Sequence, residues 1–271
     1  MWQRAEAWGF DHAWTYDHLT WRGHRDLPWF GAMPTLTAAA MVTSRIRIGT
    51  LVAHPTFRHP LPFAKELITL DDISDGRLTL GIGAGGTGWD STMLGNDPWT
   101  PIERGERFVE FVELTDRLLR TPASTVQGRY YSTAEARTYP GCTQQPRIPF
   151  AIAATGPNGM RLAARHAQTW VTTGNRRRRG PIGADEGAGD VAAQMRRLDA
   201  TCAEAGRAPG TLDRLVVTGP ILDPGLASVE AFHHTAGCYA AVGVTDLVVH
   251  WPRADEPYRA SDAVFEQIFA I

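Results

Sequence analysis

The sequence has few cysteines and no apolar run near the ~20 residues that cross a bilayer. Its three cysteines, Cys142, Cys202 and Cys238, are scattered and show no C-x-x-C spacing. This set argues against a disulfide framework and a structural zinc site. The N-terminal segment is charged and amphipathic and lacks the apolar stretch of a signal peptide. We therefore expect a cytoplasmic protein with no membrane partner.

Lysine is almost absent, and neither sign of charge dominates. The 27 Lys and Arg residues oppose 29 Asp and Glu, and the pI near 6.5 gives no electrostatic basis for a nucleic-acid partner. Lys65 is the only lysine, a preference for arginine that indicates a GC-rich genome. With 271 residues and 43% hydrophobic content, the chain suits one α/β barrel or two smaller domains.

Short β-branched runs alternate with segments of helical spacing along the chain. Continuous apolar runs that alternate with helices are typical of a parallel sheet buried on both faces. The expected strands are 13–16, 46–52, 77–82, 148–153, 169–173, 215–218 and 246–250.

Helix starts carry clear signals. Thr100 precedes Pro101 and Glu103, which predicts a capped helix from residue 101. Pro60 opens a second helix, and Ser261 is placed to cap the last one.

Seven strands and eight helical segments, with a helix first, predict a TIM (β/α)8 barrel whose first strand lies upstream of Met1. An open sheet is the alternative. No shift in composition marks a second domain, so residues 1–271 are expected to form one barrel domain.

Residues 121–147 predict a small inserted hairpin. Residues 174–190, with Arg176 to Arg179, predict a mobile loop that is solvated surface, a lid, or an anchor for an anionic cofactor tail.

In a parallel barrel the active site lies at the carboxyl ends of the strands. The segments in that position are rich in glycine and nearly free of acids: 17–18, 51–54, 83–86, 154–157, 173–174, 219–220 and 250–251. A metal-dependent hydrolase would need several converging His and carboxylate ligands. Asp17, His18, His54 and His250 are available, but no H-x-H or H-E-x-x-H motif is present, so we expect no bound metal.

Two glycine-rich turns suit a flat or phosphorylated ligand. Gly81 to Gly86 lets main chain approach a ligand closely, with a tight strand-to-helix turn as the alternative. The segment from Thr155 to Gly159 enters a helix, whose first amides either bind phosphate or form an ordinary cap.

Several segments together resemble the luciferase-like flavin and deazaflavin oxidoreductases. The order of Leu-Asp, Ser-x-Gly-Arg and Gly-x-Gly is specific to that family, and the similarity spans most of the chain. The matching segments are Trp8–Trp14 leading to Asp17-His18, Ile46–Thr50, Leu70–Leu78, Gly81–Gly83, Ala153–Pro157 and Ala163–Ala167.

The resemblance implies a TIM barrel, led by a strand upstream of the first helix, that binds FMN or coenzyme F420 at its carboxyl-terminal face. Asp17 and His18 would lie beside the isoalloxazine ring, with His18 as proton donor or substrate-orienting residue. Leu51-Val52 would form the bulge behind the ring, often with a cis peptide bond. The other expected cofactor-binding residues are Ala84, Ala154, Thr155, Gly156, Thr173 and Gly174.

The sequence also departs from the family's sugar-phosphate dehydrogenases. Their Glu after the strand-four glycines is replaced here by the glycine-rich segment 85–88, and their active-site Trp is matched only loosely by Trp21. Trp89 and Asp90 are candidates to replace these groups.

The resemblance favours hydride transfer between F420 and a small organic substrate, since arginine-rich codon usage is typical of the actinobacteria that make this coenzyme. Expected lining residues Trp14, Leu51, Val52 and Trp251 favour a hydrophobic substrate. An FMN-dependent monooxygenase is the first alternative, and a non-catalytic cofactor-binding barrel is the second. The family resemblance also implies a homodimer.

Overall fold

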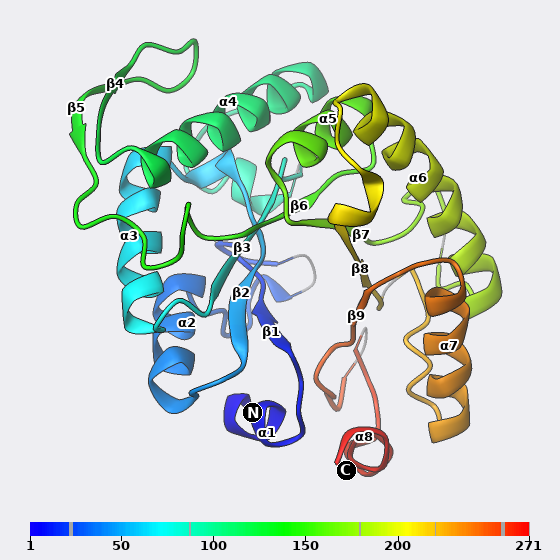
Figure 1. The fold of residues 1–271 in the computed structure, drawn as a ribbon. Coiled ribbons are helices and arrows are strands. Elements are labelled where there is room, and N and C mark those ends of the chain that lie inside the picture. The colour runs from blue at the N-terminus through cyan, green and yellow to red at the C-terminus, as the bar shows by residue number, and fades with distance from the viewer. Residues whose placement is uncertain (22–23, 87, 179, 220, 256–257, 271) are drawn as a thin grey trace. The chain divides into compact units, whose positions relative to one another are not determined.

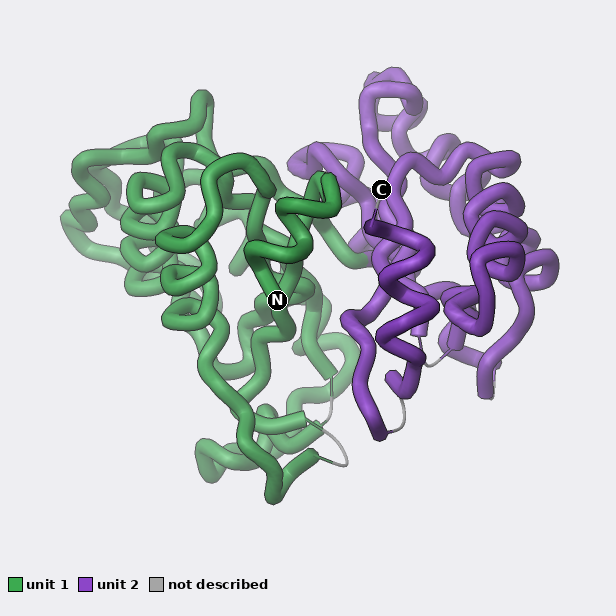
Figure 2. Tube along the Cα trace, turned by 90° about the horizontal axis from the view of Figure 1, so that it is seen from below, with its two compact units in different colours: residues 1–153 green, residues 154–271 purple. Residues whose placement is uncertain are grey.

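In the computed structural model, β-strands alternate with α-helices along the chain (Figure 1). The structure describes residues 1–21, 24–86, 88–178, 180–219, 221–255 and 258–270. These residues form two compact units, 1–153 and 154–271, coloured separately in Figure 2. That residues 1–271 form one domain stays a prediction.

The first unit is built mainly from a parallel sheet and four α-helices. Its helices are α1 (Trp2–Ala7), α2 (Ala32–Val42), α3 (Pro60–Ile73) and α4 (Pro101–Arg120), with short 3-10 turns η2 (Pro55–Phe57) and η3 (Trp89–Ser91). Its strands are β1 (His12–Thr15), β2 (Arg47–Ala53), β3 (Leu78–Gly83), β4 (Ala123–Val126), β5 (Thr133–Arg137) and β6 (Phe150–Ala153).

Four of these strands pair in parallel in the order β1-β2-β3-β6. Every residue of β3 is buried, which explains why its sequence is apolar without alternation. Gly81 on β3 lies so close to β2 that an added Cβ would stand 1.9 Å from the carbonyl oxygen of Thr50. This glycine is therefore required by strand packing.

Arg77 and Asp71 tie helices and loops of the first unit together. The Arg77 guanidinium donates to the carbonyl oxygens of Ala40, Thr43 and Ile46, which closes the end of α2. The fully buried Asp71 accepts from the backbone and side-chain amides of Gln144. Asp71 and Arg77, both within the motif that carries the family resemblance, thus serve the fold.

The expected capping signals are present. Thr100 Oγ1 accepts from the backbone N–H of Glu103 at the start of α4, and Pro60 opens α3. Within the segment 121–147, strands β4 and β5 pair antiparallel, as a hairpin requires.

The second unit carries a three-stranded parallel sheet in the order β7-β8-β9. Its helices are α5 (Pro157–His166), α6 (Ala184–Glu204), α7 (Val229–Ala241) and α8 (Asp262–Phe269), with a 3-10 turn η4 (Pro209–Thr211). Its strands are β7 (Thr169–Thr172), β8 (Asp213–Val217) and β9 (Asp246–Val248). Ser261 Oγ accepts from Val264 N and caps α8, as the sequence predicts.

The predicted loop over 174–190 is wrong in its second half, because α6 begins at Ala184. Glycines at 187 and 189 suggested a loop, but Gly187 is needed in the helix: a Cβ there would stand 2.4 Å from Tyr239 Oη. Arg178 pairs with Glu186 and Asp190 on this helix. Arg179 lies outside the described residues.

The α/β class and all seven predicted strands are confirmed, with shifts of at most two residues at their ends. Among the described residues, no helix combines the length and apolar character needed to span a membrane.

Candidate active site

The carboxyl ends of β1, β2 and β3 gather four polar side chains in the first unit. Asp17 and His18 follow β1, His54 follows β2, and Asp90 lies in η3 on the segment that leaves β3. Parallel strands end at one edge of a sheet, so segments far apart in the sequence meet there.

His18 and Asp90 form the central pair of this cluster. His18 Nδ1 lies 2.5 Å from Asp90 Oδ2, and the backbone N–H of Leu19 donates to Asp90 Oδ1 at 2.6 Å. The side chains of His18 and Asp90 are 24% and 11% exposed, so both are largely shielded from water. A carboxylate at Nδ1 favours the tautomer with hydrogen on that nitrogen, which leaves Nε2 as the atom that can exchange a proton.

The charge state of Asp90 is fixed by its surroundings. Burial acts to raise the pKa of its carboxyl group, but the hydrogen bonds from His18 and the Leu19 N–H, together with the nearby His54 ring, outweigh burial and hold the pKa well below its usual range. Asp90 is therefore a carboxylate at neutral pH.

His54 is a buried neighbour of this pair. Its Nε2 lies 3.5 Å from Asp90 Oδ2, and its ring centroid is 5.3 Å from that of His18. Its Nδ1 has no hydrogen-bond partner among the described residues, and neither has the buried Thr56 Oγ1 nearby on η2. Gly85 faces both, since a Cβ there would lie 2.7 Å from Thr56 Oγ1.

The side chains of His18, His54 and Asp90 are close enough to be considered as metal ligands. Two atoms bound to one zinc ion in tetrahedral geometry are about 3.3 Å or more apart. The 2.5 Å distance between His18 Nδ1 and Asp90 Oδ2 is shorter and indicates a direct hydrogen bond between the two side chains. This arrangement therefore suits proton transfer better than metal coordination.

Asp17 is held by Arg58, which the sequence analysis missed. Arg58 Nε and Nη2 donate to the two carboxylate oxygens of Asp17 at 2.6 and 2.8 Å, and Nη1 donates to Glu66. Burial acts to lower the pKa of Arg58, but the hydrogen bonds and charges of Asp17 and Glu66 raise it overall. A buried carboxylate requires such a partner, but the burial of Asp17 is seen only in the tertiary structure, so the sequence carried no signal for Arg58.

Aromatic rings surround His18. The rings of Tyr16 and Trp21 are stacked with centroids 5.8 Å apart, and Trp21 also stacks on Trp29 at 6.2 Å. Trp29 Nε1 donates to the carbonyl oxygen of His18 at 2.9 Å. Trp29 was not among the sequence candidates, although the nine tryptophans of the chain gave a general signal.

The bulge and cis peptide bond expected at Leu51-Val52 are both present. Leu51 is buried, whereas Val52 and Ala84 are half-buried. Gly86 has open space where a side chain would be, but Gly83 contacts Val52 closely. The glycine-rich segment thus serves strand packing at its start and leaves open space only at its end; Thr87 lies outside the described residues.

In the second unit, the residues expected to contact phosphate lie at the start of α5. Gly156 is the N-cap of this helix and makes no side-chain cap, while Pro157 occupies the first turn. Ala154 is fixed from both sides, since its N–H donates to Val171 and its carbonyl oxygen accepts from Trp170 Nε1. The first-turn amides of α5 can therefore receive an anion.

The expected residues after β7 divide into two kinds. Thr173 is exposed and available to a ligand, whereas Gly174 is buried with φ +82° and its missing Cβ would lie 2.8 Å from Leu222. Gln194 Nε2 donates to the Gly174 carbonyl oxygen, and Gln194 Oε1 accepts from Thr172. Gly174 therefore has a clear structural role, and its cofactor contact stays a prediction.

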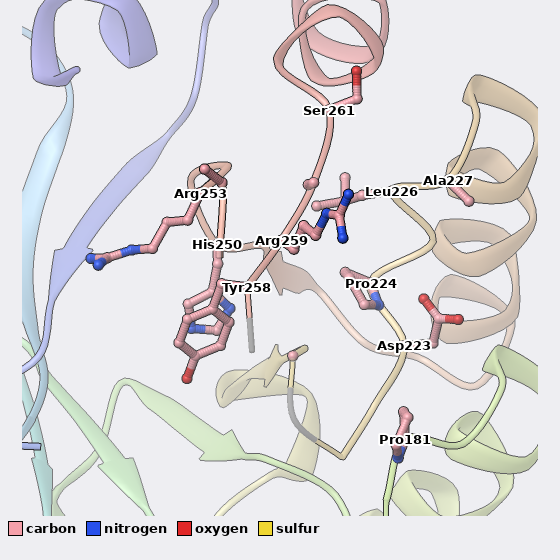
Figure 3. A pocket seen from close by; sticks show the side chains of 13 residues that line it. Pro181, Asp223, Pro224, Leu226, Ala227, His250, Arg253, Tyr258, Arg259 and Ser261 are labelled. Atoms are coloured by element: carbon pink, nitrogen blue, oxygen red, sulfur yellow. The ribbon is translucent and has the colours of Figure 1, made fainter. Parts of the chain in front are cut away.

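A pocket of about 930 Å³ lies in the second unit beyond β8 and β9 (Figure 3). His250 and Tyr258 stack on its wall with ring centroids 3.7 Å apart. Burial, with the nearby Arg253 charge, lowers the pKa of His250 to about 4, so this imidazole is neutral at pH 7. Figure 3 shows Arg253 pointing away from Asp223, whereas Arg259 lies on the same side as Asp223.

Comparison with known proteins identifies the family. Residues 1–245 match the model of the luciferase-like monooxygenases, and the chain belongs to this family. It is 31% identical to an F420-dependent glucose-6-phosphate dehydrogenase from Beutenbergia cavernae, over 93% of this chain and 86% of that one. An F420-dependent hydroxymycolic acid dehydrogenase from Mycobacterium tuberculosis is 32% identical over 62% of this chain and 46% of its own.

Solved structures show the same fold. An F420-dependent tetrahydromethanopterin reductase from Methanopyrus kandleri superposes with a TM-score of 0.72 at 21% identity, covering 90% of this chain and 86% of that one. An F420-dependent secondary alcohol dehydrogenase, in complex with an F420-acetone adduct, gives 0.75 at 18% identity, covering 90% and 85%. The predicted luciferase-like fold is therefore confirmed.

Proposed function

We propose that this chain is an oxidoreductase that transfers a hydride between coenzyme F420 and a small organic substrate, with His18 as the proton-transferring residue. The observation that carries this proposal is the His18–Asp90 pair at the carboxyl edge of the β1-β2-β3 sheet. Family membership and the F420-dependent relatives support the choice of coenzyme.

The residues present fit such a coenzyme in each unit. In the first, His54 Nδ1 and Thr56 Oγ1 are buried polar atoms that have no hydrogen-bond partner in the part of the chain that the structure describes, and a Cβ at Gly85 would fill the space beside them. In the second, the uncapped start of α5 at Gly156 offers backbone N–H groups to a phosphate. We assign His54, Thr56 and Gly85 to the surroundings of the coenzyme's ring, and Ala154, Thr155 and Gly156 to the contact with its phosphate.

When bound, F420 supplies or accepts the hydride, and the protein must handle the accompanying proton. For oxidation of an alcohol, bound F420 would serve as the hydride acceptor, and His18 Nε2 would take the hydroxyl proton. Asp90 keeps its own charge, holds Nδ1–H and stabilises the imidazolium that results. In the reverse direction the same Nε2 donates the proton to the carbonyl oxygen.

The surroundings of His18 favour a substrate with apolar surface. Tyr16, Trp21 and Trp29 stack beside it, and the buried Leu51 lies at the bulge of β2. The Glu of the sugar-phosphate dehydrogenases has no counterpart in the glycine-rich segment after β3. We therefore favour a small hydrophobic alcohol or ketone over a sugar phosphate.

The test is a titration of the full chain with F420 and separately with FMN, followed by turnover. Substrates are glucose 6-phosphate and a series of short and aromatic secondary alcohols. Micromolar F420 binding, weak FMN binding and turnover lost in His18→Asn support the proposal. Tight FMN binding alone indicates the monooxygenase alternative, and F420 binding without turnover of any substrate indicates the non-catalytic barrel. Binding of neither coenzyme overturns the proposal.

A homodimer in the cytoplasm remains a prediction from the family resemblance and the sequence. Light scattering coupled to size exclusion measures the mass directly, and a 29.7 kDa species would contradict the dimer.

A further inference from the structure

A second cluster of metal-binding side chains lies outside the candidate active site, on the surface of the second unit. It consists of Asp185 in the first turn of α6 and His234 and Cys238 on α7. His234 Nε2 lies 3.2 Å from Asp185 Oδ2 and 3.7 Å from Cys238 Sγ, and Cys238 Sγ lies 3.6 Å from Asp185 Oδ1.

The helices place these three side chains independently of any ion. His234 and Cys238 are four residues apart on α7, so they project from the same face of that helix. Next to Cys238, the buried Tyr239 packs against Gly187, which has no side chain to hold α6 away. This contact lies two residues from Asp185 and brings its carboxylate to the His-Cys face.

We propose that Asp185, His234 and Cys238 bind a Zn²⁺ ion that joins α6 to α7, with water in the fourth position. Zinc bonds of about 2.0–2.3 Å put tetrahedral ligand atoms roughly 3.3–3.7 Å apart. The observed separations are close to this spacing: His234 Nε2 lies 3.2 Å from Asp185 Oδ2, and Cys238 Sγ lies 3.6 Å from Asp185 Oδ1 and 3.7 Å from His234 Nε2, with either Asp185 oxygen available as the ligand.

The distances between ligand atoms distinguish the cluster of Asp185, His234 and Cys238 from the cluster at His18. There, the 2.5 Å contact to Asp90 is too short for two ligands of one ion. Here, no pair is that short, and His234 and Asp185 are 61% and 84% exposed, so an ion reaches them without displacing packed side chains. On binding, the Cys238 thiol loses its proton to solvent and coordinates as thiolate, while His234 binds as neutral imidazole and Asp185 as carboxylate.

The test is a titration of the chelator-stripped full chain with ZnCl₂, with bound zinc measured by mass spectrometry after gel filtration. We expect one zinc per chain. Co²⁺ in its place should give visible bands typical of tetrahedral geometry and a near-ultraviolet thiolate charge-transfer band that disappears in Cys238→Ser. Zinc should also protect Cys238 from alkylation while Cys142 reacts at its usual rate.

Variants decide which residues hold the ion. Asp185→Asn, His234→Gln and Cys238→Ser should each weaken zinc binding at least tenfold. The matched control is His233→Gln, an exposed neighbour on α7 that should leave affinity unchanged. The proposal is overturned if the stripped protein takes up no zinc, if cobalt gives no thiolate band, or if zinc binding is lost in His54→Gln and kept in Asp185→Asn.

Discussion

Replacing Asp90 by Asn tests the proton-transfer role of His18 with little change in shape. The Asn oxygen can still accept from the Leu19 N–H, which now reaches Asp90 Oδ1 at 2.6 Å. The Asn amide group, however, would donate to His18 Nδ1 where the carboxylate now accepts from it. His18 would then carry its hydrogen on Nε2, the wrong tautomer for taking a proton from an alcohol.

The size of the effect follows from the interaction that is lost. A hydrogen bond to a charged partner contributes about 1.5–3 kcal/mol, which corresponds to roughly a 10- to 150-fold loss in rate. Both side chains are largely shielded from water, so we expect the upper part of that range. Binding of F420 should change by less than about threefold, because Asn keeps the size of Asp90 and leaves the polar atoms His54 Nδ1 and Thr56 Oγ1 in place.

Two measurements check this result. Single-turnover hydride transfer is followed by the absorbance of F420 in wild type, Asp90→Asn and the control Asp97→Asn, an exposed acid a few residues further along the chain. Nitrogen-15 NMR of labelled histidine identifies the His18 tautomer without any substrate. A wild-type rate in Asp90→Asn, or hydrogen on Nδ1 of His18 in both proteins, would refute the reasoning.

Three further predictions concern stability and are measured by denaturation. Arg58→Ala leaves the buried Asp17 carboxylate unpaired and should lower the free energy of unfolding by about 3–5 kcal/mol; a loss below 1 kcal/mol would contradict the buried pair. Gly81→Ala forces a contact at 1.9 Å and should destabilise by about 3 kcal/mol, whereas Gly86→Ala, in open space, should be neutral. Backbone hydrogen bonds, led by that from the Arg45 N–H, lower the pKa of Glu6 to about 2, so its stabilisation is complete above pH 4.5 and is lost as pH falls toward 2. Glu6→Gln should therefore have a lower Tm than wild type at pH 7, with a difference that narrows by pH 3; a constant difference would contradict this assignment.

The alternation of strands and helices was predictable because it depends on local sequence. Apolar runs identified all seven strands, and Thr100, Pro60 and Ser261 marked helix starts through contacts within three residues. His18 and Asp17 were also predictable as strand-end residues, since position after β1 is a property of the sequence alone. The prediction of a loop was wrong from Ala184 onward. Gly187 lies in a helix, where a side chain would collide with Tyr239 of another helix.

The sequence by itself thus determined the α/β class and the segments that carry the chemistry. Only the tertiary structure decided which side chains meet: Asp90 lies 72 residues from His18, Arg58 lies 41 from Asp17, and Asp185 lies 49 from His234. Local patterns specify how a segment folds and which face it buries. Contacts between distant residues depend on strand order, register and the path of each loop, and these are set only when the elements pack together.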